Sequence, residues 1–234
     1  MEVNAHLTVR RYNPEVSDEP WWQTFELRAQ DTESVLDLLH RAKWYHDGTL
    51  ALRSACGEGT CGADAMLING RNRLACTAIL ADLGTDVVVE PLPGLPVRKD
   101  LIVDLEPFFE GVRSVRPWLE SSAPGPRSER LQSPRARARL DAATRCTLCA
   151  ACTSSCPIFW ADDTYVGPAA LVQAHRFVSD DRDGTRAERL ERLSQRTGVF
   201  RCRTVFNCTD VCPEGIPVTE LIQELKRAIL DEAL

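Results

Sequence analysis

Seven of the ten cysteines lie in the second half of this 234-residue chain, in two runs of similar spacing. The first run reads Cys146-x2-Cys149-x2-Cys152-x3-Cys156-Pro157. This is the spacing of bacterial ferredoxins, in which the fourth cysteine ligates the other cluster of a pair. Three thiolates spaced by two residues on a loop can hold three corners of an iron–sulfur cube, while the fourth points towards a neighbouring cube. One run therefore predicts two clusters.

The second run repeats the first with one position changed. It reads Cys202-x5-Cys208-x3-Cys212-Pro213, and Val205 stands where the first run has its middle cysteine. Exchange of the fourth ligands between the runs gives two unequal sites. The predicted [4Fe–4S] ligands are Cys146, Cys149, Cys152 and Cys212. The remaining thiolates are those of Cys156, Cys202 and Cys208. Because valine cannot bind iron, this set of three is predicted to hold a [3Fe–4S] cluster.

A pair of zinc sites is the main alternative, because CxxC pairs also bind zinc with four ligands per ion. Seven thiolates do not divide into two sets of four, and no histidine lies within the runs to complete them. Disulfides are disfavoured for a chain expected in a reducing compartment. The zinc alternative predicts a colourless interaction module without redox activity.

The first half contains a third cysteine pattern, Cys56-x4-Cys61-x2-Asp64-x11-Cys76. This is the plant-type [2Fe–2S] spacing with an aspartate in the third cysteine position. Glycines at 57, 59 and 62 allow a tight loop whose amide groups can face the cluster, because glycine tolerates positive φ. A carboxylate can ligate iron, so Asp64 is predicted to be a direct ligand. The alternative is a loop-capping aspartate beside a three-cysteine site.

The elements around these cysteines differ between the two halves. Alternation and β-branched residues predict strands near residues 7–11, 24–27, 66–68 and 87–90. One helix is predicted over 33–45, with a cap at Asp31. Further along, helical periodicity is found over 169–177, 186–195 and 219–232. The first half is therefore predicted to be α+β, and the second all-helical with cysteine loops between helices.

The predicted connection between the halves is residues 111–140, where serine, proline and glycine accompany arginines 127, 130, 135, 137 and 139. This composition is expected to break regular structure. A solvated linker is favoured over an interaction surface. The predicted domains are residues 1–115 and 141–234, joined by a connector over 116–140.

Composition excludes several functions. Lysine and arginine number 28 against 34 acidic residues, which gives a formal net charge of −6. A protein that binds nucleic acid by neutralising phosphates is therefore not expected. No apolar run approaches the roughly 18 residues of a membrane span. No Ser–His–Asp set or phosphate-binding glycine loop indicates a catalytic site. His175, with apolar neighbours in a predicted helix, is expected to pack or lie at the surface rather than bind a metal.

Segments outside the cysteines, together with these patterns, resemble the iron–sulfur subunit of succinate dehydrogenase or of its relative fumarate reductase. They include Ser54-Ala55-Cys56, Leu74-Ala75-Cys76, Glu106-Pro107-Phe108-Phe109, Gln132-Ser133-Pro134, Gly167-Pro168-Ala169-Ala170 and Phe200-Arg201-Cys202-Arg203. The resemblance covers nearly the whole chain. It implies an N-terminal β-grasp plant-type [2Fe–2S] ferredoxin domain followed by an all-helical two-cluster ferredoxin-type domain. Aspartate at the third [2Fe–2S] position is a known variant in this family, which supports Asp64 as a ligand.

The resemblance also implies a role. In the family, a flavoprotein partner that holds FAD oxidises succinate to fumarate, and electrons pass singly through [2Fe–2S], [4Fe–4S] and [3Fe–4S] clusters to a membrane quinone. The chain would then relay electrons without binding succinate. Its implied partners are the flavoprotein and membrane anchor subunits, which would hold it peripherally at the cytoplasmic face of the inner cell membrane. Fumarate reductase, with the reverse flux, is the alternative. The subunit of another flavoprotein oxidoreductase is disfavoured, because it should lack the family segments.

The quinone in this family lies beside the [3Fe–4S] cluster, near the segment after the shared Cys-Pro. The resemblance therefore assigns Pro157 and Trp160 to the quinone vicinity, with core packing as the alternative for the tryptophan. Ubiquinone-linked members carry a second tryptophan where this chain has Ala161, and a histidine where it has Arg203. These departures favour a different quinone, and menaquinone is the hypothesis.

Overall fold

A computed structural model describes residues 1–121, 125 and 129–232. The chain divides into two compact units. The first comprises Met1–Leu105 together with Cys149–Ser155, and the second comprises Glu106–Leu148 with Cys156–Leu234. Part of the predicted connector, residues 122–124 and 126–128, lies outside the described residues. No helix in the described part of the chain is long and apolar enough to span a membrane.

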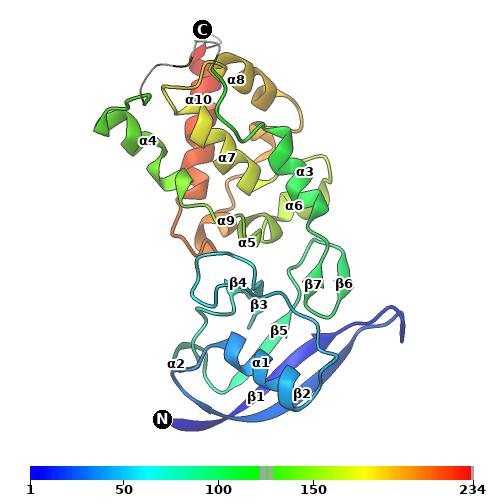
Figure 1. Ribbon diagram of the computed structural model, residues 1–234. Helices are drawn as coiled ribbons and strands as arrows, with labels where there is room; N and C mark the ends of the chain where they lie inside the picture. Colours follow the sequence, from blue (N-terminus) through cyan, green and yellow to red (C-terminus); the bar gives the residue numbers. More distant parts are fainter. Residues whose placement is uncertain (122–124, 126–128, 233–234) are drawn as a thin grey trace. The chain divides into compact units, whose positions relative to one another are not determined.

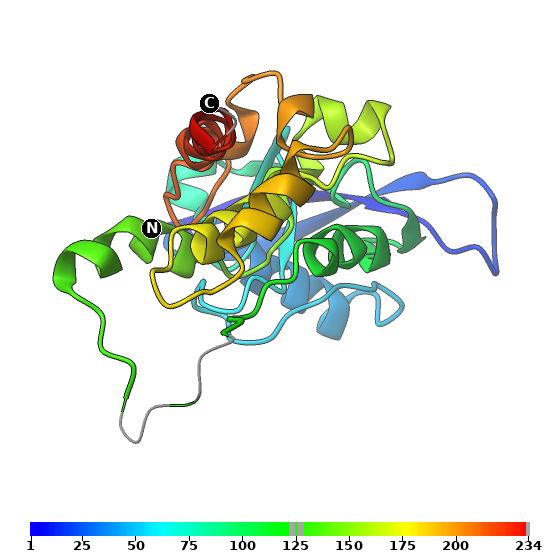
Figure 2. The same cartoon turned by 90° about the horizontal axis from the view of Figure 1, so that it is seen from above.

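The first unit is built on a five-stranded sheet in the order β2-β1-β5-β3-β4 (Figure 1). Its strands are β1 (Glu2–Arg11), β2 (Trp21–Gln30), β3 (Ala65–Ile68), β4 (Arg71–Leu74) and β5 (Asp86–Glu90). The β1–β5 pair is parallel and the other pairs are antiparallel. A separate antiparallel pair follows, β6 (Val97–Lys99) and β7 (Ile102–Val103). The four predicted strands are confirmed, and β1 and β2 extend further as a long ribbon (Figure 2).

Helix α1 (Val35–Tyr45) packs its apolar stripe into the core of this unit. Its buried residues are Val35, Leu36, Leu38, Leu39 and Ala42. The predicted cap at Asp31 is wrong, because Ser34 caps the helix. The hydroxyl of Ser34 accepts from the amide of Asp37, whose carboxylate accepts from the Ser34 amide in return. A four-residue helix, α2 (Leu80–Leu83), lies between β4 and β5.

A buried ion network fixes the segment that leads to the first cysteine loop. Arg11 and Asp100 are 2% and 0% exposed, and the Arg11 Nε lies 2.9 Å from the Asp100 Oδ1. Asp100 also accepts from the amides of Tyr12 and Ala51. Arg11 donates to the Asp47 carboxylate at 2.8 Å. These contacts attach residues 47–51 to the end of β1, so the chain enters the cysteine loop from a fixed point.

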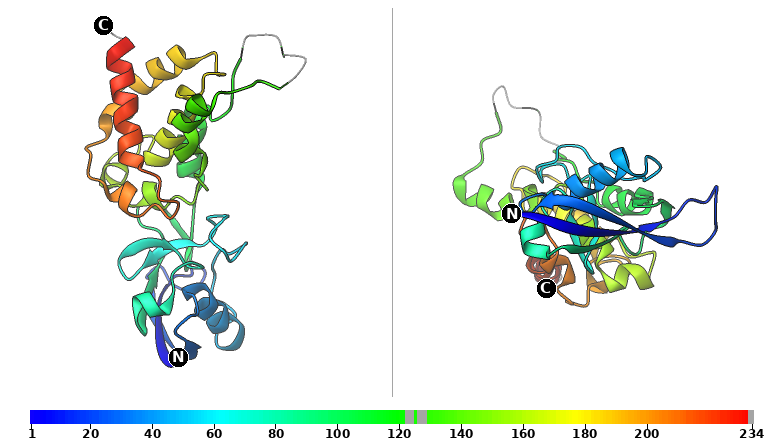
Figure 3. Two further views of the ribbon diagram at one scale, coloured as in Figure 1. Left: turned by 90° about the vertical axis from the view of Figure 1, so that its left-hand side faces the viewer. Right: turned by 90° about the horizontal axis from the view of Figure 1, so that it is seen from below.

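The regular secondary structure in the described residues of the second unit is all helical. Its α-helices are α3 (Glu106–Ser114), α4 (Pro134–Thr144), α6 (Pro157–Ala161), α7 (Pro168–Val178), α8 (Arg186–Ser194), α9 (Asn207–Asp210) and α10 (Val218–Glu232). A short 3-10 helix, η1, spans Val199–Arg201. Helix α7 is buried along almost its whole length and contacts α3, α4, α8 and α10. Figure 3 shows α10 as the long red helix of this unit. The predicted helices α7, α8 and α10 are confirmed.

The expectation that residues 111–140 lack regular structure is wrong at both ends. Helix α3 continues to Ser114, and α4 begins at Pro134. The hydroxyl of Ser133 accepts from the amide of Ala136 at 3.1 Å, and proline at the first helical position suits the start of α4. Arginine and alanine are good helix formers, so charge alone did not break this segment.

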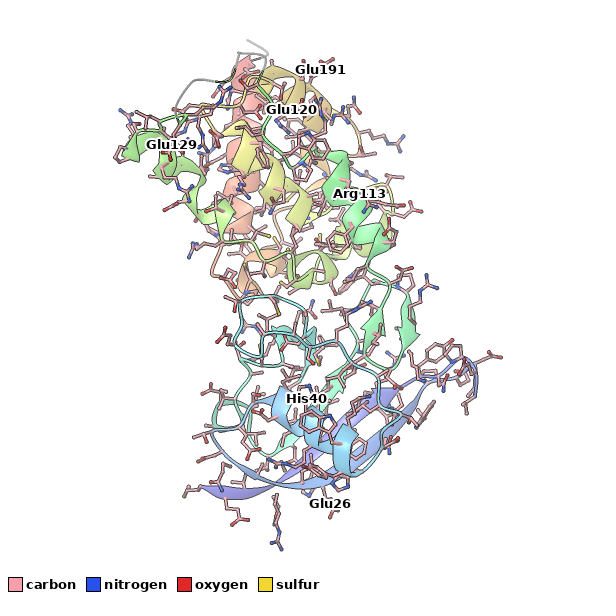
Figure 4. All side chains as sticks on the ribbon, viewed as in Figure 1. Glu26, His40, Arg113, Glu120, Glu129 and Glu191 are labelled. Carbon is pink, nitrogen blue, oxygen red and sulfur yellow. The ribbon has the colours of Figure 1, made fainter. Side chains whose placement is uncertain are left out.

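The chain that follows α3 is held by a buried arginine. Arg189 on α8, with 4% of its side chain exposed, donates to the carbonyls of Val115, Arg116 and Trp118. Its guanidinium lies 2.9 Å from the Asp183 carboxylate and 3.9 Å from Glu120, which is labelled in Figure 4. Breaking such a buried pair costs about 3–5 kcal/mol, so this network belongs to the stability of the second unit.

His175 is buried on α7, as the sequence predicts for a packed histidine. Its Nε2 lies 2.7 Å from the Glu224 Oε2 and 3.3 Å from the Ser179 hydroxyl. Burial lowers the pKa of His175, although Glu224 acts in the opposite direction. The imidazole is therefore a structural group that joins α7 to α10.

Candidate metal centres

The first cysteine loop lies between α1 and β3 and directs backbone amides at sulfur. The amides of Glu58 and Cys61 donate to the Cys56 sulfur at 3.5 and 3.3 Å, and the Cys56 amide donates to the Cys61 sulfur at 3.4 Å. Gly57, Gly59 and Gly62 have φ values of 74°, 82° and 68°. These left-handed conformations favour glycine and turn the N–H groups inward. Such a loop is suited to hold an anionic iron–sulfur centre.

Asp64 is 2% exposed and its two carboxylate oxygens differ. The Oδ2 accepts from the amide of Cys76 at 2.6 Å, and the backbone carbonyl of Asp64 accepts from Ala75. The Oδ1 is buried without a hydrogen-bond partner among the described residues. A buried oxygen without a partner costs free energy, and a metal ion would satisfy it. The structure thus combines the capping contact with an oxygen that fits iron ligation.

The thiols of this site differ in acidity. Hydrogen bonds from the Glu58 amide, and then from Thr60 and Cys61, lower the pKa of Cys56 to about 6. Burial, and then the contact with Asp64, raise the pKa of Cys76 to about 12. Without a cluster, Cys56 is therefore largely a thiolate at neutral pH, whereas Cys76 is a thiol. A cluster ligated by Cys76, as the spacing predicts, would have to displace the proton of this thiol.

This difference predicts an order of modification in cluster-free protein. Because the thiolate is the nucleophile, iodoacetamide at pH 7 is expected to alkylate Cys56 before Cys76. Peptide mass spectrometry over a time course measures the order. Lowering the pH from 8 to 5 should slow the reaction of Cys56 only as the pH falls through about 6. Equal rates at Cys56 and Cys76 would contradict the prediction.

Cys156, Cys202 and Cys208 come together in the second unit. Cys208 is buried, and its thiol is close enough to Cys202 and Cys156 for their charges to act on it. Burial is the main cause that raises the pKa of Cys208 and of Cys156. Cys156 and Cys202 are only half-buried, so the assignment of these three thiols to one cluster remains a prediction from their spacing. A cluster would supply the positive charge that ionised thiolates need.

Two residues of α10 contact two of these three cysteines. The Thr219 hydroxyl lies 3.5 Å from the Cys208 sulfur, and the Lys226 Nζ donates to the Cys202 carbonyl at 3.0 Å. The sequence analysis missed both residues. A buried threonine among the apolar positions of α10, with a lysine seven residues further on, is the signal that was available.

The two cysteine runs share an unusual backbone. Leu148 and Thr204 have φ values of 57° and 59° at equivalent places, two residues after the first cysteine of each run. Ala150 and Phe206 follow with φ values of 66° and 69°. Residues other than glycine rarely adopt this left-handed region, and such conformations gather at functional sites. The repeat seen in the sequence is therefore also a repeat of backbone conformation.

The short helices continue this repeat. Ala150 and Phe206 precede α5 (Ala151–Ser154) and α9 (Asn207–Asp210). Val205, which is 49% exposed, occupies the place that Cys149 has in the first run. The second run thus shares the backbone conformation of the first and has a valine in place of Cys149.

The predicted [4Fe–4S] ligands divide between the units. Cys146 and Cys212 lie in the second unit, where burial is the main cause that raises the pKa of Cys146 and the Cys212 charge adds to it. Cys149 and Cys152 belong to the first unit, where Cys152 is buried and Cys149 packs against the core. The assignment of these four ligands remains a prediction from their spacing.

The residues predicted near the quinone lie on α6. Pro157 is its first residue, and none of its five residues is buried. Trp160 is 52% exposed, so it does not pack in the core. Phe200 and Phe206 are also exposed large apolar side chains, at 42% and 49%.

Comparison with known proteins extends this description. Residues 6–110 match the family model of a 2Fe-2S iron-sulfur cluster binding domain, and residues 142–216 that of a 4Fe-4S dicluster domain. The fold and the cysteine patterns thus define a two-domain iron–sulfur protein. The fold class predicted from the sequence is confirmed.

Relatives name the family. The chain is 42% identical over 229 residues to the succinate dehydrogenase iron-sulfur subunit of Coxiella burnetii, covering 97% of each chain. It is 42% identical to the mitochondrial succinate dehydrogenase [ubiquinone] iron-sulfur subunit of Dictyostelium discoideum, covering 95% of this chain and 81% of that one. A chain of the Mycobacterium smegmatis Sdh1 complex in the apo form superposes with a TM-score of 0.90 at 26% identity, with 99% and 98% coverage. The chain belongs to the family of succinate dehydrogenase iron–sulfur subunits, which confirms the resemblance.

Proposed function

We propose that this chain is the electron-transfer subunit of a membrane-bound succinate:quinone oxidoreductase. The identity of 42% to a succinate dehydrogenase iron–sulfur subunit over nearly the whole of both chains carries the proposal. The cysteine patterns agree with it, because the relay needs centres that each carry one electron between a two-electron donor and a two-electron acceptor. When bound, the clusters supply this one-electron chemistry.

The residues of this chain would hold the clusters in three sets. The [2Fe–2S] set is Cys56, Cys61, Asp64 and Cys76. The [4Fe–4S] set is Cys146, Cys149, Cys152 and Cys212. The [3Fe–4S] set is Cys156, Cys202 and Cys208. The domains 1–115 and 141–234, with the connector 116–140, remain part of the proposal.

Charges near the sets would bias the potentials. The anionic Asp64 stabilises the more positively charged, oxidised state of the first centre. The Lys226 ammonium, which donates to the carbonyl of Cys202, stabilises the reduced state of the third. These charges favour electron flow from the first unit towards the three-cysteine set.

The proposal includes partners that the chain requires for this role. A flavoprotein subunit that holds FAD would deliver electrons, and membrane anchor subunits would hold the chain at the cytoplasmic face of the cell membrane. The quinone, for which menaquinone is the hypothesis, would accept electrons near Pro157 and Trp160. The 52% exposure of Trp160 supports this place, because the side chain is accessible to a partner or ligand.

Low-temperature EPR on the anaerobically purified complex tests the proposal. We expect a [3Fe–4S] signal in the oxidised sample, and [2Fe–2S] and [4Fe–4S] signals after dithionite reduction. Iron should approach about nine atoms per chain, with matching acid-labile sulfide. Silent spectra with stoichiometric zinc and no sulfide would overturn the electron-transfer function and leave a structural metal module.

A further inference from the structure

One ion pair in the second unit connects the two segments that supply Cys156 and Cys202. The Arg201 guanidinium pairs with the Asp162 carboxylate. Arg201 directly precedes Cys202, and Asp162 is the C-cap of α6, the helix for which Cys156 is the N-cap. The pair is largely shielded, with 33% and 14% of the two side chains exposed.

The arginine end of the pair is firmly placed. Val199 in η1 is 0% exposed, and a Cβ added to Gly198 would meet the Leu193 carbonyl oxygen at 2.1 Å. The Lys226 ammonium holds the following segment through the Cys202 carbonyl. Packing and hydrogen bonds therefore fix the backbone from which Arg201 extends.

The aspartate end lies on a helix that is packed less tightly. None of the residues of α6 is fully buried: Pro157, Ile158 and Phe159 are half-buried, and Trp160 and Ala161 are exposed. The hydrophobic effect therefore holds this helix less firmly than it holds η1. The Asp162 Oδ1 accepts from the amide and hydroxyl of Thr164 at 3.1 and 2.6 Å, which fixes the carboxylate in its turn. The Oδ2 faces Arg201. A displacement of α6 would separate the two charges.

We propose that the Arg201–Asp162 pair is a positioning pair, which fixes α6 and its exposed Trp160 relative to the segment that supplies Cys202. The inference rests on the proposed function, which places the electron acceptor beside this helix. Neither residue ligates iron in the proposal, and neither need touch the acceptor. Their contribution is to keep one short surface helix in the geometry that electron transfer requires.

The test uses the intact complex with the substitutions Asp162→Asn and Arg201→Gln. We expect faster hydrogen exchange in peptides covering residues 157–164, and a KM for a short-chain menaquinone or ubiquinone analogue raised on the order of tenfold. The turnover number should change less, about twofold. Reduction of the clusters by succinate without quinone, followed by EPR, should be unchanged.

Three further variants sharpen the test. The double variant should be no worse than either single variant, because both remove the same contact. Asp162→Glu, which keeps the charge, should recover most of the quinone affinity. Asp141→Asn is the matched control, since it removes the exposed Arg137–Asp141 pair of the same unit and should alter neither readout.

The outcomes distinguish failure of the positioning role from failure of the proposed function. Unchanged exchange and KM in both single variants would overturn the positioning role while leaving the proposed function intact. Loss of the [3Fe–4S] signal in the variants would also overturn it, because the pair would then hold the ligands rather than the helix. Absence of that signal and of quinone reduction in the unmodified complex would instead overturn the proposed function itself.

Discussion

Val205→Cys is expected to convert the three-cysteine site into a four-cysteine site. The backbone of the second run already matches that of the first on both sides of this position, with the pairs 148/204 and 150/206 left-handed in each. A thiolate at 205 would therefore stand where the fourth iron of a cube needs a ligand. The oxidised [3Fe–4S] EPR signal should disappear, and iron should rise from about nine to about ten atoms per chain.

The same substitution should reduce quinone reduction by succinate at least a hundredfold. Cluster type sets the potential over a wide range, and for a one-electron step each fall of about 59 mV disfavours transfer tenfold. A fall of about 120 mV in the reduction potential of this centre is enough for a hundredfold loss. Val205→Ala, which adds no ligand, is the control and should keep the signal. An unchanged signal in the cysteine variant would show that position 205 does not face the cluster.

Substitution of Asp64 is expected to have the second large effect, on the [2Fe–2S] centre. Asp64→Asn keeps an oxygen that can accept from the Cys76 amide but removes the carboxylate. If Asp64 ligates iron, this variant should lose the [2Fe–2S] signal and about two iron atoms per chain. Asp64→Cys supplies the usual thiolate and should retain the centre. Retention of a full [2Fe–2S] signal in Asp64→Asn would show that the aspartate only caps the loop.

Asp64→Ala adds a measure of the capping contact. It leaves the Cys76 amide without its 2.6 Å acceptor, and an unsatisfied buried donor costs about 1–3 kcal/mol. Thermal unfolding of the complex should therefore occur at a lower temperature in Asp64→Ala than in Asp64→Asn, although both lack the cluster.

The parts of the fold that the sequence predicted are those with strong local signals. Alternation indicated β1 and β5, and apolar residues at helical spacing indicated α7 and α10. Strand β4 was missed because Arg71–Leu74 is mostly polar. This segment is a strand because it pairs with β3. The cap at Ser34 was missed because Asp31 is an equally good capping residue type, and only the packing of the helix selects between them.

The candidate metal centres likewise have a part that the sequence predicted and a part that it did not. Cysteine spacing is a local property, so the three ligand sets could be written from the sequence. The charges around them come from elsewhere in the chain: Lys226 on α10, which donates to the Cys202 carbonyl, lies 24 residues after that cysteine. The pairing of Arg201 with Asp162 likewise depends on how two loops are packed. These contacts join residues that are far apart in the sequence, so local sequence patterns do not predict them.

The segment Cys149–Ser155 has a consequence for how this protein is made. It belongs to the first unit, where the Asn72 amide donates to the Ala151 carbonyl at 2.9 Å and the Ser154 hydroxyl to the Pro93 carbonyl at 2.7 Å. On the ribosome, these partners emerge about 50 residues after Leu105, which at about 5–20 residues per second is a delay of several seconds. During translation the N-terminal half therefore stays incomplete until this piece of the Cys146–Cys156 run has been made. A gene cut after the first half would yield a chain that never receives it.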